Sequence, residues 1–142
     1  MKGGEEMLDI EMQKQLIELI KEQLHPDFLI LFGSFATGKA HEQSDVDLAY
    51  FSDKHLSPYE RFILAGDLAQ VCGREIDLIN IKDIDTVFAM QIFADGMPIY
   101  IADENEFVRQ RMRAYSMYVT LNEQRAPIIE AIKERGSVFG DE

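Results

Sequence analysis

Apolar residues recur along the first part of the chain at spacings of three and four positions. Between Leu8 and Leu24 they form one buried stripe of an amphipathic helix. Pro26 should end this helix, because the residue before a proline resists helical backbone angles. The next apolar run, Phe28–Phe32, is short and continuous, as in a strand that is covered on both faces. The pattern therefore predicts a helix followed by a buried strand.

Residues 45–50 alternate between polar and apolar with the period of two that is typical of a strand. The apolar side chains point to one face, and Asp45 and Asp47 point to the other. Residues 35–44, between the two strands, are mostly small and polar, and they predict a short helical turn and a loop.

A second long helix has a clear start signal. Ser57 is the predicted N-cap, Pro58 occupies the first helical position, and Glu60 completes a capping box. We expect this helix to run to about Val71 and to end near Gly73.

The remaining elements complete one domain of the α/β (α+β) class. We expect a strand over 75–81, a helix over 84–94 that stops at Gly96, an edge strand over 97–101 with Pro98, and a helix from Asp103 to at least Leu121 that Pro127 breaks or kinks. The predicted domain spans residues 7–135, with flexible segments at 1–6 and 136–142.

The composition is that of a globular domain and narrows the possible partners. Apolar residues make up 46% and charged residues 28% of the 142 positions, and no apolar run approaches the roughly 20 residues of a membrane span. The formal charge of −12 argues against direct binding to nucleic acid, which requires a basic surface. The polar N-terminus is no secretory signal, and the single cysteine, Cys72, suits a reducing compartment, so we expect a cytoplasmic protein.

Three acidic residues are candidates for metal binding. Asp45 and Asp47 lie two positions apart on one strand, so their carboxylates share a face with Cα atoms roughly 6.5 Å apart. Asp77 stands in a second, otherwise apolar strand. If the two strands are neighbours, all three carboxylates converge on a pair of Mg²⁺ ions. Alternatively, Asp45 and Asp47 are solubilising residues of a wet face, and Asp77 caps a loop or pairs with Arg74.

A glycine and a serine directly follow the first strand. Gly33 would allow a phosphate to approach the backbone, and Ser34 would add a hydroxyl donor at the start of a short helix. A turn glycine followed by an N-cap serine is the alternative interpretation.

Together these residues resemble the minimal nucleotidyltransferases of the DNA polymerase β superfamily. That family is marked by Gly-Ser, ten intervening residues, Asp-x-Asp, and a third acid on a later strand. Gly33-Ser34, residues 35–44 and Asp45-Val46-Asp47 match this spacing without a gap, and Asp77 fits the third acid. The segment 94–100 also fits, so the resemblance covers residues 24–118 or so.

The resemblance implies a site as well as a fold. It implies Mg²⁺ held by the catalytic residues Asp45, Asp47 and Asp77, and a nucleotide bound by Gly33, Ser34 and Lys39. Many relatives carry an arginine where this chain has Thr37. Lys39 or Arg61 could replace its contact with the triphosphate, or both could be plain surface residues.

Stand-alone members of this size resemble the antitoxins that are encoded beside HEPN-domain ribonuclease toxins. The resemblance implies that such an enzyme transfers AMP from ATP to a tyrosine hydroxyl of the cognate toxin. Two alternatives stay open, namely an aminoglycoside-type nucleotidyltransferase and a non-catalytic protein that masks the toxin. The aminoglycoside enzymes usually have an additional helical domain, which this chain lacks.

Other polar residues have plainer interpretations. His25, His41 and His55 have no metal-ligand spacing and are expected at the surface, while Cys72 is expected to be a buried helical residue. The last long helix is basic and aromatic, so it either packs its tyrosines on the sheet or docks a partner. The residues concerned are Arg109, Arg111, Arg113, Tyr115 and Tyr118.

Overall fold

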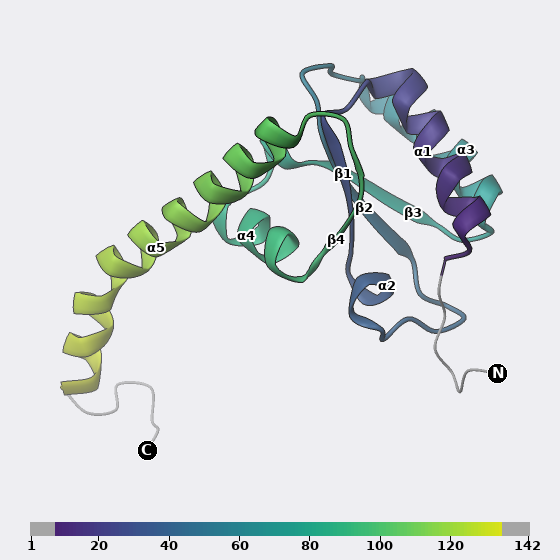
Figure 1. The fold of residues 1–142 in the computed structure, drawn as a ribbon. Coiled ribbons are helices and arrows are strands. Elements are labelled where there is room, and N and C mark those ends of the chain that lie inside the picture. Colours follow the sequence, from purple (N-terminus) through teal and green to yellow (C-terminus); the bar gives the residue numbers. More distant parts are fainter. Residues whose placement is uncertain (1–7, 135–142) are drawn as a thin grey trace.

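The computed structural model describes residues 8–134, and it describes side chains for residues 8–124. The predicted flexible segments 1–6 and 136–142 lie outside the described residues. Along the chain the elements are α1 (Ile10–Leu24), β1 (Phe28–Phe32), α2 (Ser34–Thr37), β2 (Val46–Phe51), α3 (Pro58–Cys72), β3 (Ile76–Asn80), a 3₁₀ turn η1 (Ile81–Asp83), α4 (Thr86–Asp95), β4 (Met97–Ile101) and α5 (Glu104–Glu134) (Figure 1).

The four strands form one mixed sheet in the order β3-β2-β1-β4. β1 pairs antiparallel with both of its neighbours, whereas β2 and β3 run parallel. β4 lies at the edge, as its proline predicted, and the register of its pairing with β1 shifts between Leu29 and Ile30. The mixed α+β architecture that the sequence predicted is confirmed.

Helices cover both faces of the sheet (Figure 1). Leu29 and Leu31 of β1 pack in the core beneath α1 and α3, while Phe28 and Ile30 pack in a second core beneath α4 and α5. The four side chains are at most 2% exposed, which confirms that the apolar run is a strand buried on both faces. We call the two sides of the sheet the α1/α3 face and the α4/α5 face.

The caps that the sequence predicted are present in the structure. Ser57 and Glu60 form a complete capping box at the start of α3, and Gly73 ends that helix with a left-handed φ of 70°. α4 begins later than expected, because residues 81–83 form the 3₁₀ turn and Asp85 caps the helix by accepting a hydrogen bond from the Phe88 amide.

The sequence predicted that Pro127 breaks or kinks the last helix, and the structure excludes the break, while the kink stays a prediction. α5 continues through Pro127 to Glu134. A proline removes one backbone donor, but helical turns on either side propagate cooperatively, so one lost bond does not end the helix. With 31 residues α5 is about 46 Å long, and it projects from the body of the domain (Figure 1).

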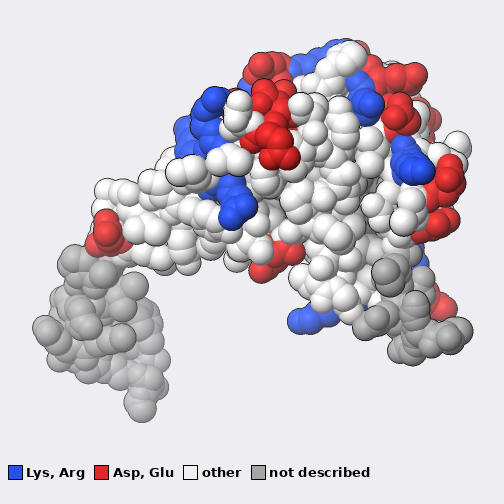
Figure 2. Space-filling view, viewed as in Figure 1, with Lys and Arg blue, Asp and Glu red and all other residues white. Residues whose placement is uncertain are grey.

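Charge is unevenly distributed over the face shown in Figure 2. Acidic side chains gather over α1 and near the start of α5, basic side chains lie along the first part of α5, and the centre of this face has few charges. Among the described residues, no helix has the length and hydropathy needed to cross a membrane.

Candidate active site

The parallel pairing of β2 with β3 brings two of the candidate acids together. Asp47 and Asp77 are direct partners in the register, on strands about 4.8 Å apart. Asp47 alternates with residues that pack on the α1/α3 face, such as Leu48, so both acids lie on the α4/α5 face of the sheet. Asp45 lies one residue before β2, and the period of two directs it to the same side as Asp47.

The electrostatics agree with this crowding of carboxylates. The pKa of Asp47 is raised above its usual value by burial, and further by the negative charges of Asp77 and Asp45. Each additional carboxylate makes ionisation of Asp47 less favourable. A cation bound between the acids would relieve this repulsion.

Gly33 is packed against the Asp47 carboxylate. A Cβ added at Gly33 would overlap Oδ2 of Asp47 and stand 3.1 Å from its Cγ. The backbone of Gly33 has φ 74° and ψ −152°, a region open essentially only to glycine. The close contact with Asp47 and the backbone angles at this position therefore both require glycine.

A short helix follows Gly33 and returns the chain towards β2. The carbonyl of Gly33 accepts hydrogen bonds from the amides of Ala36 and Thr37, at 3.0 and 3.2 Å, and from Oγ1 of Thr37 at 3.3 Å. The Lys39 amide donates to the carbonyl of Ser34 at 3.0 Å, while the Lys39 side chain is exposed. Ser34 and Lys39 are thus held in one turn beside Asp47. Their contact with a nucleotide stays a prediction.

Arg74 is a positioning residue that the sequence did not identify. Its guanidinium lies over the Phe35 ring, 4.9 Å from the centroid, and one guanidinium nitrogen donates to three carbonyls of the loop that leads into Asp45. Those carbonyls belong to His41, Glu42 and Ser44, at 2.9 to 3.1 Å. No motif marks such a contact, since the loop and Arg74 are 30 or more positions apart.

The three acids fit a magnesium site that a substrate completes. Among the described residues, no three acidic, histidine or cysteine side chains form a ready-made metal cage. Mg²⁺ usually takes one or two carboxylates and fills its other positions with phosphate oxygens and water. Asp47 and Asp77 are adjacent, Asp45 lies near them, and Gly33 leaves room for the Asp47 carboxylate, so the three acids suit that kind of site.

Arg61 does not lie where it could replace the family's missing arginine. It belongs to α3, whose buried residues pack in the core of the α1/α3 face, whereas the acids lie on the opposite face. The structure therefore contradicts this alternative for Arg61. Lys39 stays a prediction, because it shares a turn with Ser34.

The remaining candidates lie where the sequence indicated. The three histidines are exposed, and Cys72 is a buried free cysteine. On α5, Arg109 pairs with Glu106, Arg111 lies 5.9 Å from the Tyr115 ring centroid, and Tyr115 packs against the core of the α4/α5 face.

Comparisons with known proteins identify the family of the chain. The family described as "Polymerase beta, Nucleotidyltransferase" matches residues 14–105. A curated relative from Shewanella oneidensis, the protein adenylyltransferase MntA, is 27% identical over 121 residues, covering 84% of this chain and 86% of the relative. A second MntA, from Aphanizomenon flos-aquae, is 25% identical over 113 residues, covering 72% and 75%.

Solved structures share the fold. A crystal structure of a toxin–antitoxin with AMP-PNP superposes with a TM-score of 0.73 at 25% identity, covering 85% of this chain and 98% of the other. A structure of an MNT antitoxin in complex with the tri-AMPylated HEPN toxin of Shewanella oneidensis has a TM-score of 0.70 at 22% identity, covering 87% and 97%.

Proposed function

Since the chain belongs to the polymerase beta nucleotidyltransferase family, we propose that it transfers AMP from ATP to a tyrosine hydroxyl of a cognate HEPN toxin. In this proposal it depends on Mg²⁺ and acts as the antitoxin of that toxin. The observation that carries the proposal is the pairing of Asp47 with Asp77 beside Gly33, because it gathers carboxylates in an arrangement that suits a divalent cation.

The relatives support each part of the proposed reaction. The MntA relatives are named protein adenylyltransferases, which supports AMP as the transferred group and a protein as its acceptor. The toxin–antitoxin structure at 25% identity contains AMP-PNP, an ATP analogue, which supports ATP as the donor. A partly uncharged surface over the centre of one face is suited to a protein partner (Figure 2).

The chain's own residues have distinct tasks in this mechanism. Gly33 leaves space for the Asp47 carboxylate, while Ser34 and Lys39 contribute a hydroxyl and a positive charge to the triphosphate. Asp45 and Asp47 would hold the nucleotide-bound magnesium, and Arg74 keeps the loop before Asp45 in place. Bound Mg²⁺ would supply charge neutralisation at the phosphates and make the acceptor hydroxyl more acidic.

Asp77 lies beside the position of the acceptor in this arrangement. It takes the proton of the tyrosine hydroxyl while the hydroxyl oxygen attacks the α-phosphorus of ATP. The bond from the α-phosphorus to the bridging oxygen breaks, pyrophosphate leaves, and AMP remains on the tyrosine.

Transfer of label tests the proposal directly. The purified chain is incubated with its partner protein, Mg²⁺ and ATP labelled at the α-phosphate, and the label on the partner is measured. We expect Asp45→Asn, Asp47→Asn and Asp77→Asn each to abolish the transfer. Asp67→Asn, which changes an exposed acid on α3, is the matched control and should transfer label like the unaltered chain.

Two other outcomes would assign a different function. A stable complex in which the partner never carries label would favour a protein that masks the toxin without catalysis. Adenylylation of kanamycin-like compounds, with no label on the partner, would favour a small-molecule enzyme. The formal charge of −12 would also suit these polycationic acceptors.

A further inference from the structure

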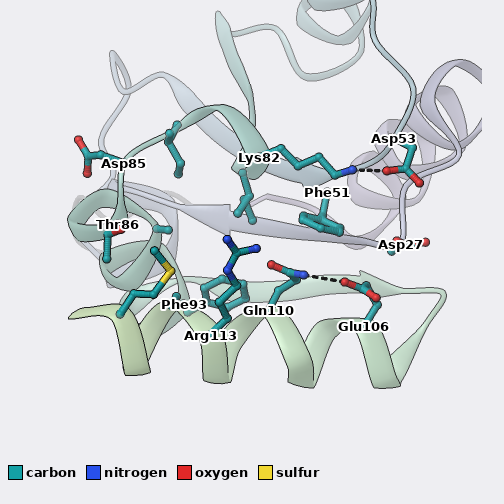
Figure 3. A pocket seen from close by; sticks show the side chains of 15 residues that line it. Asp27, Phe51, Asp53, Lys82, Asp85, Thr86, Phe93, Glu106, Gln110 and Arg113 are labelled. Atoms are coloured by element: carbon teal, nitrogen blue, oxygen red, sulfur yellow. Dashed lines mark hydrogen bonds and ion pairs between the residues drawn. The ribbon is translucent and has the colours of Figure 1, made fainter. Parts of the chain in front are cut away.

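A cavity of about 500 Å³ opens on the α4/α5 face of the sheet, away from the three acids. It lies between the C-terminal end of β2, the 3₁₀ turn η1, the start of α4 and one side of α5 (Figure 3). Its volume falls in the range of roughly 300–1,000 Å³ that is typical of sites for small molecules.

The cavity and the acids are at opposite ends of the same strand. Phe51 lines the cavity and lies four residues after Asp47 in β2, which corresponds to about 13 Å between their Cα atoms. Both side chains are on the α4/α5 face of the sheet. The cavity is therefore separate from the site formed by Gly33 and the three acids, but it lies on the same face of the sheet.

The floor of the cavity is apolar and rigid. The buried rings of Phe51 and Phe93 line it, together with Ile81 and Ala89. The Phe51 ring stacks on Phe28 with centroids 5.3 Å apart and an angle of 2° between the planes. The Lys82 ammonium also lies over the Phe51 ring, 5.1 Å from its centroid, so a flat aromatic ring would pack on the apolar surface of Phe93, Ile81 and Ala89.

Two charged side chains of the lining make no ion pair or hydrogen bond with the described residues. The Arg113 side chain points from α5 into the cavity (Figure 3), and within residues 8–124 it makes no ion pair or hydrogen bond. The half-buried Asp27 carboxylate likewise has none in that part of the chain. In contrast, Lys82 pairs with Asp53, and Glu106 accepts from Arg109 and Gln110.

The spacing of the two unpaired groups matches a bipolar ligand. Glu106 lies close enough to Asp27 to act on it electrostatically, and Arg113 is seven residues further along α5, about 10 Å along the helix axis. An arginine fork binds phosphate or carboxylate, while a carboxyl group at the other end receives hydrogen bonds from amino or hydroxyl groups. The ligand therefore carries one anionic group, a flat ring and polar donors at the far end.

We propose that this cavity binds a nucleoside monophosphate, in addition to the triphosphate at the three acids. The phosphate pairs with Arg113, the base lies against Phe93 and the neighbouring apolar side chains of the floor, and Asp27 receives a hydrogen bond from an amino or hydroxyl group. The carboxylates of Asp53, Asp85 and Glu106 also line the cavity and oppose the larger negative charge of a triphosphate. The choice of AMP rests on the proposed function, in which AMP is either free or already attached to the partner.

Titration of the full chain with AMP by calorimetry tests the site. We expect Arg113→Ala to weaken AMP binding by about tenfold or more, as loss of a charge-assisted contact should. Arg111→Ala removes a neighbouring arginine outside the cavity and should bind AMP like the unaltered chain, and so should Asp47→Asn. Arg113→Gln provides a second variant if the alanine variant unfolds.

Two results would overturn the proposal. One is that the unaltered chain binds no AMP. The other is that Asp47→Asn abolishes AMP binding while Arg113→Ala preserves it. The nucleotide would then bind only at the site of the three acids.

A second experiment distinguishes free AMP from AMP attached to the partner. Partner protein that carries one AMP is offered as the acceptor, and mass spectrometry measures the further units added. The site binds attached AMP if the ratio of doubly to singly modified partner is lower with Arg113→Ala than with Arg111→Ala. It binds free AMP if the two variants give the same ratio. If no variant modifies the partner, the proposed function fails, while the calorimetric titration still decides whether the cavity binds AMP.

Discussion

Replacing Gly33 with alanine tests whether the glycine keeps the catalytic acids in place. The added methyl group would overlap Oδ2 of Asp47, and the carboxylate would have to move by about 1 Å. A displacement of that size among reacting groups lowers the rate of catalysis about 100-fold. The backbone angles of Gly33, φ 74° and ψ −152°, add a strain of roughly 1–3 kcal/mol for any other residue.

Gly38→Ala is the matched control. Gly38 also has a positive φ, 78°, but no atom lies within 4 Å of an added Cβ, so this change strains the backbone without displacing Asp47. We expect both variants to unfold at a melting temperature about 3–10 °C lower than that of the unaltered chain. Only Gly33→Ala should lose AMP transfer.

The assay combines thermal unfolding with the labelled transfer reaction at a temperature where both variants are folded. The reasoning is refuted if Gly33→Ala transfers AMP at nearly the original rate. It is also refuted if Gly38→Ala loses as much activity, because backbone strain alone would then explain the effect.

Three further predictions concern the acids, the loop before them and the core. The raised pKa of Asp47 means that its ionisation opposes folding, so the free energy of unfolding should fall as the pH rises from its usual 3.8 through the raised value. In the absence of divalent cations, Asp47→Asn should reduce this pH-dependent fall in the free energy of unfolding. The variant should be more stable at pH 7 by at most about 1 kcal/mol, since water screens a half-exposed group. A less stable variant would contradict this prediction. Arg74→Ala should lower kcat/KM for transfer by up to about 100-fold with a small loss of stability, because a shift of about 1 Å in the loop it anchors misplaces Asp45. Unchanged kinetics would show that the loop holds without it. Ser52→Ala should cost about 1–2 kcal/mol in chemical denaturation and leave transfer unchanged, because the buried hydroxyl donates to the Leu24 carbonyl at 2.6 Å and accepts from the Lys54 amide at 3.0 Å, far from the acids.

Local physical chemistry made much of the fold predictable. The capping box of Ser57 and Glu60 marks a helix start through bonds between neighbours, which no distant residue has to supply. Phe28–Phe32 is apolar throughout, so both of its faces require cover and the strand must lie inside the sheet. The spacing of Gly33 to Asp47 indicated the family, which the matched residues 14–105 confirm.

Several features could be decided only by the assembled structure. The period of two places Asp45 and Asp47 on one side of a strand, but only the parallel pairing of β2 with β3 sets Asp47 against Asp77. The sequence likewise allowed Arg61 to serve the nucleotide, and the sheet separates it from the acids. Arg74 is recognised only through its bonds to a loop that is distant in the sequence.

The chain by itself determined which segments are helices and strands, where their caps lie and which side chains are candidates for the chemistry. These properties depend on contacts within a few residues and on burial periods that can be read along the chain. The tertiary structure decided the distances between the acids, the close packing of Gly33 on Asp47 and the cavity beside α5. Each of these requires strands and helices from different parts of the sequence to meet, which hydrophobic burial and strand pairing fix only when the whole sheet has formed.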